Sequence, residues 1–140
     1  MELYLIPSIL SLVGNALLGI YVNVKSPKSK VTYAFTVLIL LLMGWAFSET
    51  MMRSQSVETA LFWSKVSYVH SFFLPSAFLA LSYIYTGGRN LSLIVASYAL
   101  GLIFFPFLLS SHFIQEIVLI PLWGYDTQVG YLFSYFAAVY

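Results

Sequence analysis

Residues 31–48 read VTYAFTVLILLLMGWAFS, an apolar run without a formal charge between Lys30 and Glu49. A helix needs about 20 predominantly apolar residues to cross the hydrocarbon core of a bilayer. In lipid the backbone has no water to bond with, and a helix satisfies its own polar groups. The run therefore predicts a transmembrane helix over about 31–49.

Similar runs lie on both sides of this one. The last run is too short to cross, because residues 129–140 cover only about 18 Å at 1.5 Å per residue. Between the fourth and fifth runs, apolar residues mix with Pro121 and Gly124. We expect an outer loop over 112–127 there, with a helical turn or a hairpin at the membrane interface. The helices are expected at about 3–24, 31–49, 60–86, 91–111 and 128–140.

The composition supports this reading. Of the 140 residues, 61% are hydrophobic and 8% are charged, whereas soluble domains carry about 25% charged residues. The fold class predicted is all-α: one polytopic transmembrane bundle over 1–140, with four complete helices and a partial fifth. Its solvent is the lipid bilayer of the cell membrane. A net charge of +1 without a basic patch indicates no nucleic acid partner.

Basic residues gather on one side of the predicted bundle. Lys25, Lys28 and Lys30 follow the first helix, and Arg89 follows the third. Basic loops stay in the cytoplasm, so the N-terminus is predicted to be extracytoplasmic. The other side carries most of the acids, together with one arginine: Glu2, Glu49, Arg53, Glu58, Glu116 and Asp126.

Several residues inside the runs fit helix packing. Asn15 lies four residues before Gly19, and small residues let helices approach while a buried amide finds a partner. Gly44 and Trp45 suggest a similar close contact in the second helix. Pro75 predicts a kink in the third helix. A ligand site at Asn15 is the alternative.

The third run is the most polar. Ser64, Ser67, Ser71, Pro75 and Ser82 recur at near-helical spacing. One hypothesis is a polar pocket that opens outward, where Lys65 or His70 beside Ser71 binds a ligand or senses pH. The alternative is a packed face whose hydroxyls bond to their own backbone.

The sequence gives little support for a metal site, a thiol site or a catalytic site. His112 and Glu116 are four residues apart, which suits a metal on a helix, but solvated loop charges explain them better. The absence of cysteine excludes disulfides and thiolate sites. There is no catalytic constellation and no phosphate-binding glycine loop. We expect no enzyme activity, no metal and no cofactor.

A looser pattern spans the whole chain. It comprises Gly19-Ile-Tyr-Val22, Trp45, Phe62-Trp63-Ser-Lys65-Val-Ser-Tyr68, Pro75, Tyr83-Ile-Tyr-Thr86, and Val129-Gly-Tyr-Leu-Phe133 with Tyr135. With these residues the chain resembles the N-terminal seven-helix membrane region of bacterial and archaeal histidine kinases and related signalling proteins.

The resemblance implies a membrane sensor with its N-terminus outside and a cytoplasmic output module such as a kinase. It adds Trp63 and Lys65 to His70 and Ser71 as candidate ligand-binding positions. The chain departs from the family by stopping in the fifth helix, so kinase activity would lie in a missing or separate domain. Expected partners are a cytoplasmic signalling domain or partner chain, and a second copy if the chain is a sensor. A small transporter or channel component and a structural membrane subunit are the alternatives.

Overall fold

The computed structural model describes residues 5–88, 91–121 and 124–139. Glu2 and Arg89, which entered the orientation argument, lie outside these ranges. Helices dominate the fold, as predicted. The elements are α1 (Ile6–Lys25), α2 (Lys30–Ser54), α3 (Val57–Tyr85), α4 (Ser92–Phe104), the 3-10 helix η2 (Phe105–Leu109), β1 (Ile114–Ile120), β2 (Gly124–Val129) and α5 (Tyr131–Val139).

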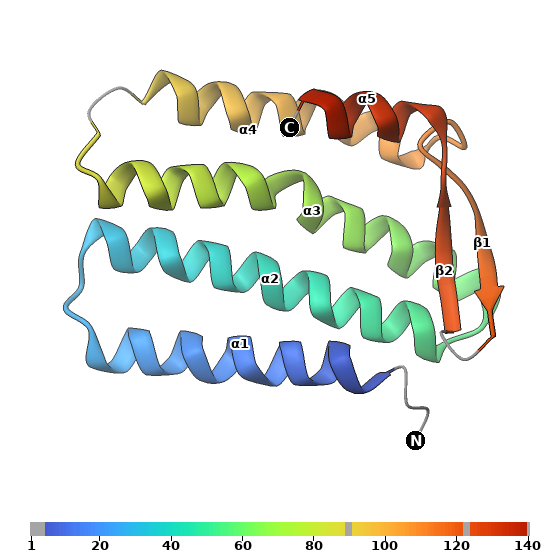
Figure 1. Cartoon of the computed structure of the whole chain (residues 1–140), viewed down its shortest axis with the longest axis horizontal. Helices are drawn as coiled ribbons and strands as arrows, with labels where there is room; N and C mark the ends of the chain where they lie inside the picture. Colours follow the sequence, from blue (N-terminus) through green and yellow to red (C-terminus); the bar gives the residue numbers. More distant parts are fainter. Residues whose placement is uncertain (1–4, 89–90, 122–123, 140) are drawn as a thin grey trace.

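The four long helices lie side by side in chain order (Figure 1), and each packs against the next. Successive helices run in opposite directions, so the turn before α2 and the α3–α4 connection share one end of the bundle. The start of α1, the α2–α3 turn and the two strands share the other end, which we name the hairpin end. At the first end, Ser29 caps α2 by accepting a 3.2 Å bond from the Thr32 amide.

The helical fold includes one short hairpin, which is one of the two structures expected for residues 112–127. β1 and β2 pair antiparallel, and Ile117 lies opposite Thr127. The β1 sequence IQEIVLI is rich in β-branched residues, which favour strands. Gly124 begins β2 with a φ of +83°, a conformation that glycine adopts without steric cost. The loop expected over 112–127 is therefore largely a hairpin.

The fourth helix is shorter than predicted. Its α-helical part ends at Phe104, and η2 continues the chain to Leu109. Pro106 explains the change, because proline has no amide hydrogen and its ring clashes with the preceding helical turn.

Among the described residues, two helices, α1 and α2, are long and apolar enough to cross a membrane. No residue of α1 is buried in the fold, although the helix is strongly apolar. Leu10 and Leu17 are 65% and 64% exposed. Apolar side chains so widely exposed along one helix are typical of a surface that faces lipid.

The core lies toward the hairpin end and is aromatic. Phe72 of α3 and Phe113, just before β1, are fully buried, with ring centroids 5.2 Å apart. Phe136 of α5 packs on Phe72 at 4.6 Å, and Leu108 of η2 joins the same cluster. Burial of aromatic rings and their edge-to-face contacts hold the hairpin and α5 against α3.

Candidate functional site

The hairpin is attached to the helices through a hydroxyl pair. The Oγ of Ser64 on α3 and the Oγ1 of Thr127 on β2 are 2.7 Å apart. Ser64 is fully buried, and the Thr127 hydroxyl also lies 3.6 Å from the sulfur of Met52 on α2. Thr127 therefore joins β2 to both α2 and α3. A buried hydroxyl that loses its partner is costly, so this contact favours one position of the hairpin.

A partly buried charge pair lies on the side of α3 that packs against α2. The Arg53 guanidinium is 3.2 Å from Oε2 of Glu49, one turn earlier on α2. The Ser67 hydroxyl donates a 2.8 Å bond to the other carboxylate oxygen of Glu49. The Arg53 and Glu49 side chains are only 13% and 19% exposed. Charged groups this buried need such partners, and removing one is expensive.

The two sets of contacts lie close together at the hairpin end, because Ser64 and Ser67 are neighbours on one face of α3. We name the two sets together the hairpin-end polar network. It connects α2, α3 and β2 and consists of Glu49, Arg53, Ser64, Ser67 and Thr127.

A cavity of about 200 Å³ opens beside the network, between α1 and α2. Glu49 and Arg53 form its polar wall on α2, and Ser8 and Ser11 contribute from α1. The remaining lining residues are Pro7, Trp45 and Ala46. A small polar molecule could reach both charges from this cavity, and protein–ligand sites commonly combine an apolar wall with a few polar groups in this way.

The four residues predicted to bind a ligand, Trp63, Lys65, His70 and Ser71, contact different parts of the fold. The Trp63 ring meets Phe47 of α2 at 5.5 Å, edge to face. Lys65 lines a separate groove between α3 and η2. The Ser71 hydroxyl donates to the Ser67 carbonyl at 3.2 Å, which is the backbone bonding given above as the alternative.

His70 packs against the backbone of α2. Its Nδ1 lies 2.8 Å from the Val66 carbonyl oxygen. A side-chain carbon added at Gly44 would lie 2.2 Å from its Nε2. The imidazole therefore occupies the space that this glycine leaves. His70 therefore faces α2, whereas Lys65 lines the groove beside η2, and ligand binding by these residues stays a prediction.

The residues predicted to mediate helix packing also lie in separate places in the bundle. Gly19 faces Ile39 of α2, with 2.9 Å between an added side-chain carbon and the isoleucine methyl group. The Asn15 amide bonds within α1, to the Ser11 carbonyl at 2.8 Å. Trp45 lines the cavity beside the polar network. Pro75 lies inside α3, which changes direction near its middle (Figure 1).

Sequence reasoning missed the residues that bond between elements. Asn23 of α1 donates a 2.9 Å bond to the Thr36 hydroxyl of α2. In the sequence, Glu49 marks a helix boundary and is one of the acidic residues of the outer side, and Thr127 falls in the expected outer loop. The available signal for Glu49 was its spacing of four from Arg53, which suits a helical ion pair.

His112 and Glu116 do not share a helix. His112 lies in a turn, with its ring tilted against that of Tyr131 at a centroid distance of 5.3 Å, and Glu116 lies in β1. Their spacing of four therefore does not place them on one helical face. In the described ranges, no group of three or more His, Cys, Asp or Glu side chains could hold a metal ion.

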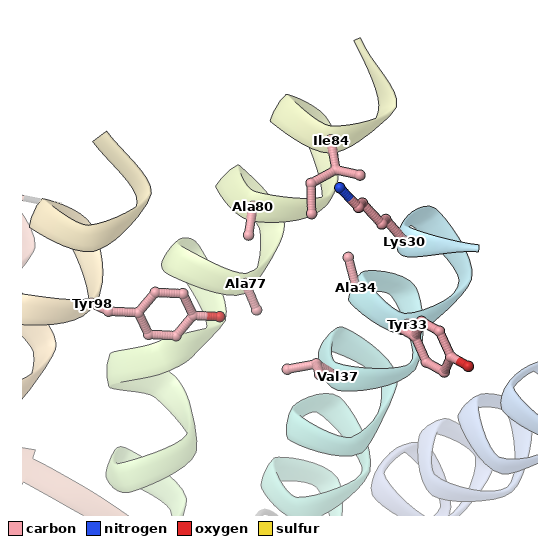
Figure 2. A pocket seen from close by; sticks show the side chains of 8 residues that line it. All are labelled: Lys30, Tyr33, Ala34, Val37, Ala77, Ala80, Ile84 and Tyr98. Carbon is pink, nitrogen blue, oxygen red and sulfur yellow. The ribbon is translucent and has the colours of Figure 1, made fainter. Parts of the chain in front are cut away.

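The opposite end of the bundle has a larger and more apolar cavity, of about 360 Å³, between α2 and α3 (Figure 2). The small side chains Ala34, Ala77 and Ala80 leave this space open. Lys30 and Tyr98 mark two of its sides, and the Tyr98 hydroxyl points toward Ala77 in Figure 2.

The apolar, exposed helices and the polar network at one end define a membrane region built from a helical bundle. A family model described as the N-terminal 7TM region of histidine kinase matches residues 7–140. The chain belongs to this family, which confirms the family resemblance noted in its sequence. No curated protein and no solved structure matches the chain.

Proposed function

We propose that this chain is the membrane-embedded sensory input region of a histidine-kinase-type signalling protein. Family membership suggests such a region. The observation that carries the proposal further is the hairpin-end polar network, which ties a small two-stranded element to two long helices. A second position of this element would have to exchange these polar bonds, so a stimulus that favours the exchange would move the hairpin relative to the two helices, as a sensor requires.

The proposed placement is multi-pass, with the N-terminus extracytoplasmic. Lys25, Lys28 and Lys30 all lie at the end opposite the hairpin, which supports a cytoplasmic position for that end. We assign α3 as a third span, because its 29 residues reach about 44 Å at 1.5 Å per residue. The fourth span combines α4 with η2, and α5 begins a fifth.

The proposed signal starts at the cavity between α1 and α2. A ligand there would exchange contacts with the Glu49–Arg53 pair. A change at Glu49 reaches α3 directly through Ser67. Only a ligand that binds one arrangement of the helices better than the other shifts their populations. The bend at Pro75 separates the outer and inner parts of α3, so movement of the outer part would re-angle the inner part.

Kinase activity, in this proposal, belongs to an output module outside these 140 residues, and the chain itself is not an enzyme. Its partners are the lipid bilayer, a cytoplasmic signalling domain or partner chain, and a second copy of itself. No nucleic acid, metal or cofactor takes part.

A disulfide lock tests the proposal. Ser64→Cys with Thr127→Cys would join α3 to β2, since the hydroxyl oxygens are 2.7 Å apart. The chain has no native cysteine, so the bond is unambiguous. The whole reading frame that contains these residues is expressed in membranes, and kinase autophosphorylation is measured before and after oxidation. We expect the phosphorylated fraction to change severalfold on oxidation and to recover on reduction.

The two single-cysteine variants are the matched controls, and oxidation should leave their phosphorylation unchanged. An unchanged phosphorylated fraction in the locked double variant would contradict the proposal. So would a reading frame without a kinase module in membranes where no kinase copurifies with the chain. That second result would favour a structural membrane subunit.

A further inference from the structure

A groove of about 190 Å³ lies between α3 and η2, away from the polar network. We name it the Lys65 groove. Its accessible lining is apolar, and its residues are Phe62, Lys65, Val66, Val69, Phe105 and Leu108. Pro106 lies in the first turn of η2, where the regular helix ends, and Phe105 and Leu108 of η2 form one wall. The groove thus results from the break in the fourth helix.

The rim of the groove faces outward. Phe62 is 59% exposed and Phe105 is 44% exposed, whereas Leu108 at the floor is 2% exposed. Two exposed aromatic side chains beside an open apolar groove suit contact with lipid chains.

Among the residues that line the groove, Lys65 alone is charged, and its aliphatic stem contributes to the apolar lining. It lies eight residues after Val57, where α3 begins, which corresponds to about 12 Å along the helix. It forms no ion pair or hydrogen bond within the described residues, and the ion pair of Glu49 with Arg53 lies on the α2 side of α3. An ammonium group at this depth is costly unless it reaches the interface or meets an anion.

We infer that the Lys65 groove binds an anionic phospholipid of the outer leaflet. One acyl chain lies along Val66 and Val69, and the Lys65 ammonium contacts the phosphodiester. The bilayer is the source of this ligand, because the rim opens to lipid and a lysine is a compact point charge suited to phosphate. The inference rests on the proposed function in one respect, the membrane placement of α3.

Native mass spectrometry of the purified protein in a neutral detergent tests the site. Phosphatidylglycerol and phosphatidylcholine with the same acyl chains are added in equal amounts. One lysine near a membrane surface favours anionic lipid by about fivefold in affinity. We expect this preference in the native chain and in Lys28→Gln, which removes an exposed lysine of the opposite end. We expect Lys65→Gln to lose it.

A second variant probes the apolar part of the site. Val66→Trp fills the groove and keeps Lys65, so it should reduce the retained phosphatidylglycerol about as much as Lys65→Gln. Circular dichroism checks that each variant folds. Equal retention of both lipids by the native chain would overturn the inference. Lys65-dependent retention of added oleate without phosphatidylglycerol would also overturn it, in favour of a free fatty acid.

Cysteine labelling of the same chain in intact cells separates this inference from the proposed function. Labelling of Ser29→Cys from the cytoplasmic side and of Gln55→Cys from outside, without a Lys65-dependent lipid preference, would reject only the lipid site. Labelling of both positions from the same side would reject the membrane placement itself.

Discussion

The contact between Ser64 and Thr127 is the most specific bond of the hairpin-end polar network, and a double-mutant cycle measures it. Ser64→Ala and Thr127→Val are made singly and together. Both changes keep the size of the side chain close to native and remove a hydroxyl. Thr127→Val also removes the 3.6 Å contact with the Met52 sulfur, an effect that cancels in the coupling energy.

The expected loss of unfolding free energy follows from how deeply the two hydroxyl groups are buried. Each single change leaves one hydroxyl without its 2.7 Å partner, which costs about 1–3 kcal/mol of unfolding free energy when the group is buried. Ser64 is fully buried but can turn toward its own helical backbone, so Thr127→Val should fall near the lower limit. Hydrogen bonds within membrane proteins couple by about 0.6 kcal/mol on average and up to about 1.7 kcal/mol. We expect a coupling in this range.

Reversible unfolding of the purified protein in mixed micelles, followed by circular dichroism, gives the four free energies. Ser110→Ala is the control, because its hydroxyl bonds only to the Phe107 carbonyl of its own exposed turn, at 2.8 Å. It should change the free energy of unfolding by less than about 0.5 kcal/mol. Strict additivity of Ser64→Ala and Thr127→Val would show that the hydroxyl pair does not hold the hairpin, and would refute the reasoning.

The same unfolding assay tests three further contacts. Gly44→Ala should lower the free energy of unfolding by about 1–3 kcal/mol, because the added methyl group clashes with His70. Adding His70→Ala to the same chain should restore most of that free energy. If the double variant is as unstable as Gly44→Ala alone, the close approach of His70 to Gly44 is contradicted. Gly130→Ala should cost about 3 kcal/mol or more, because the added carbon meets the His112 backbone carbonyl; a near-neutral change would exclude that geometry. Asn23→Ala should cost about 0.6–1.7 kcal/mol through loss of its interhelical bond, and no change would show that α1 is held by apolar packing alone.

The helical part of the fold follows from local sequence. Apolar length predicts a helix such as α2, and proline predicts the bend inside α3. The early end of α4 also had a local signal, Pro106, which the length of the apolar run obscured. Period and length are properties of a single segment, so they can be read without knowledge of neighbouring helices.

The candidate site depends on contacts that local sequence does not determine. Ser64 and Thr127 are 63 residues apart in the chain, and their contact requires the hairpin to fold back onto α3. Glu49 looked like a helix boundary because charged residues usually end membrane spans. The spacing of four to Arg53 suits the ion pair, but the contact of the Glu49 carboxylate with Ser67 follows only from the packing of α2 on α3.

The central claim is that the hairpin end senses conditions outside the cell and the lysine-rich end faces the cytoplasm. Because the chain has no cysteine, single cysteines at Ser29, Gln55 and Gln128 report their side without background. In intact cells, a membrane-impermeant maleimide should label Gln55→Cys and Gln128→Cys, and should label Ser29→Cys only after the membrane is opened. Labelling of Ser29→Cys in intact cells, or protection of both glutamine positions, would contradict the claim.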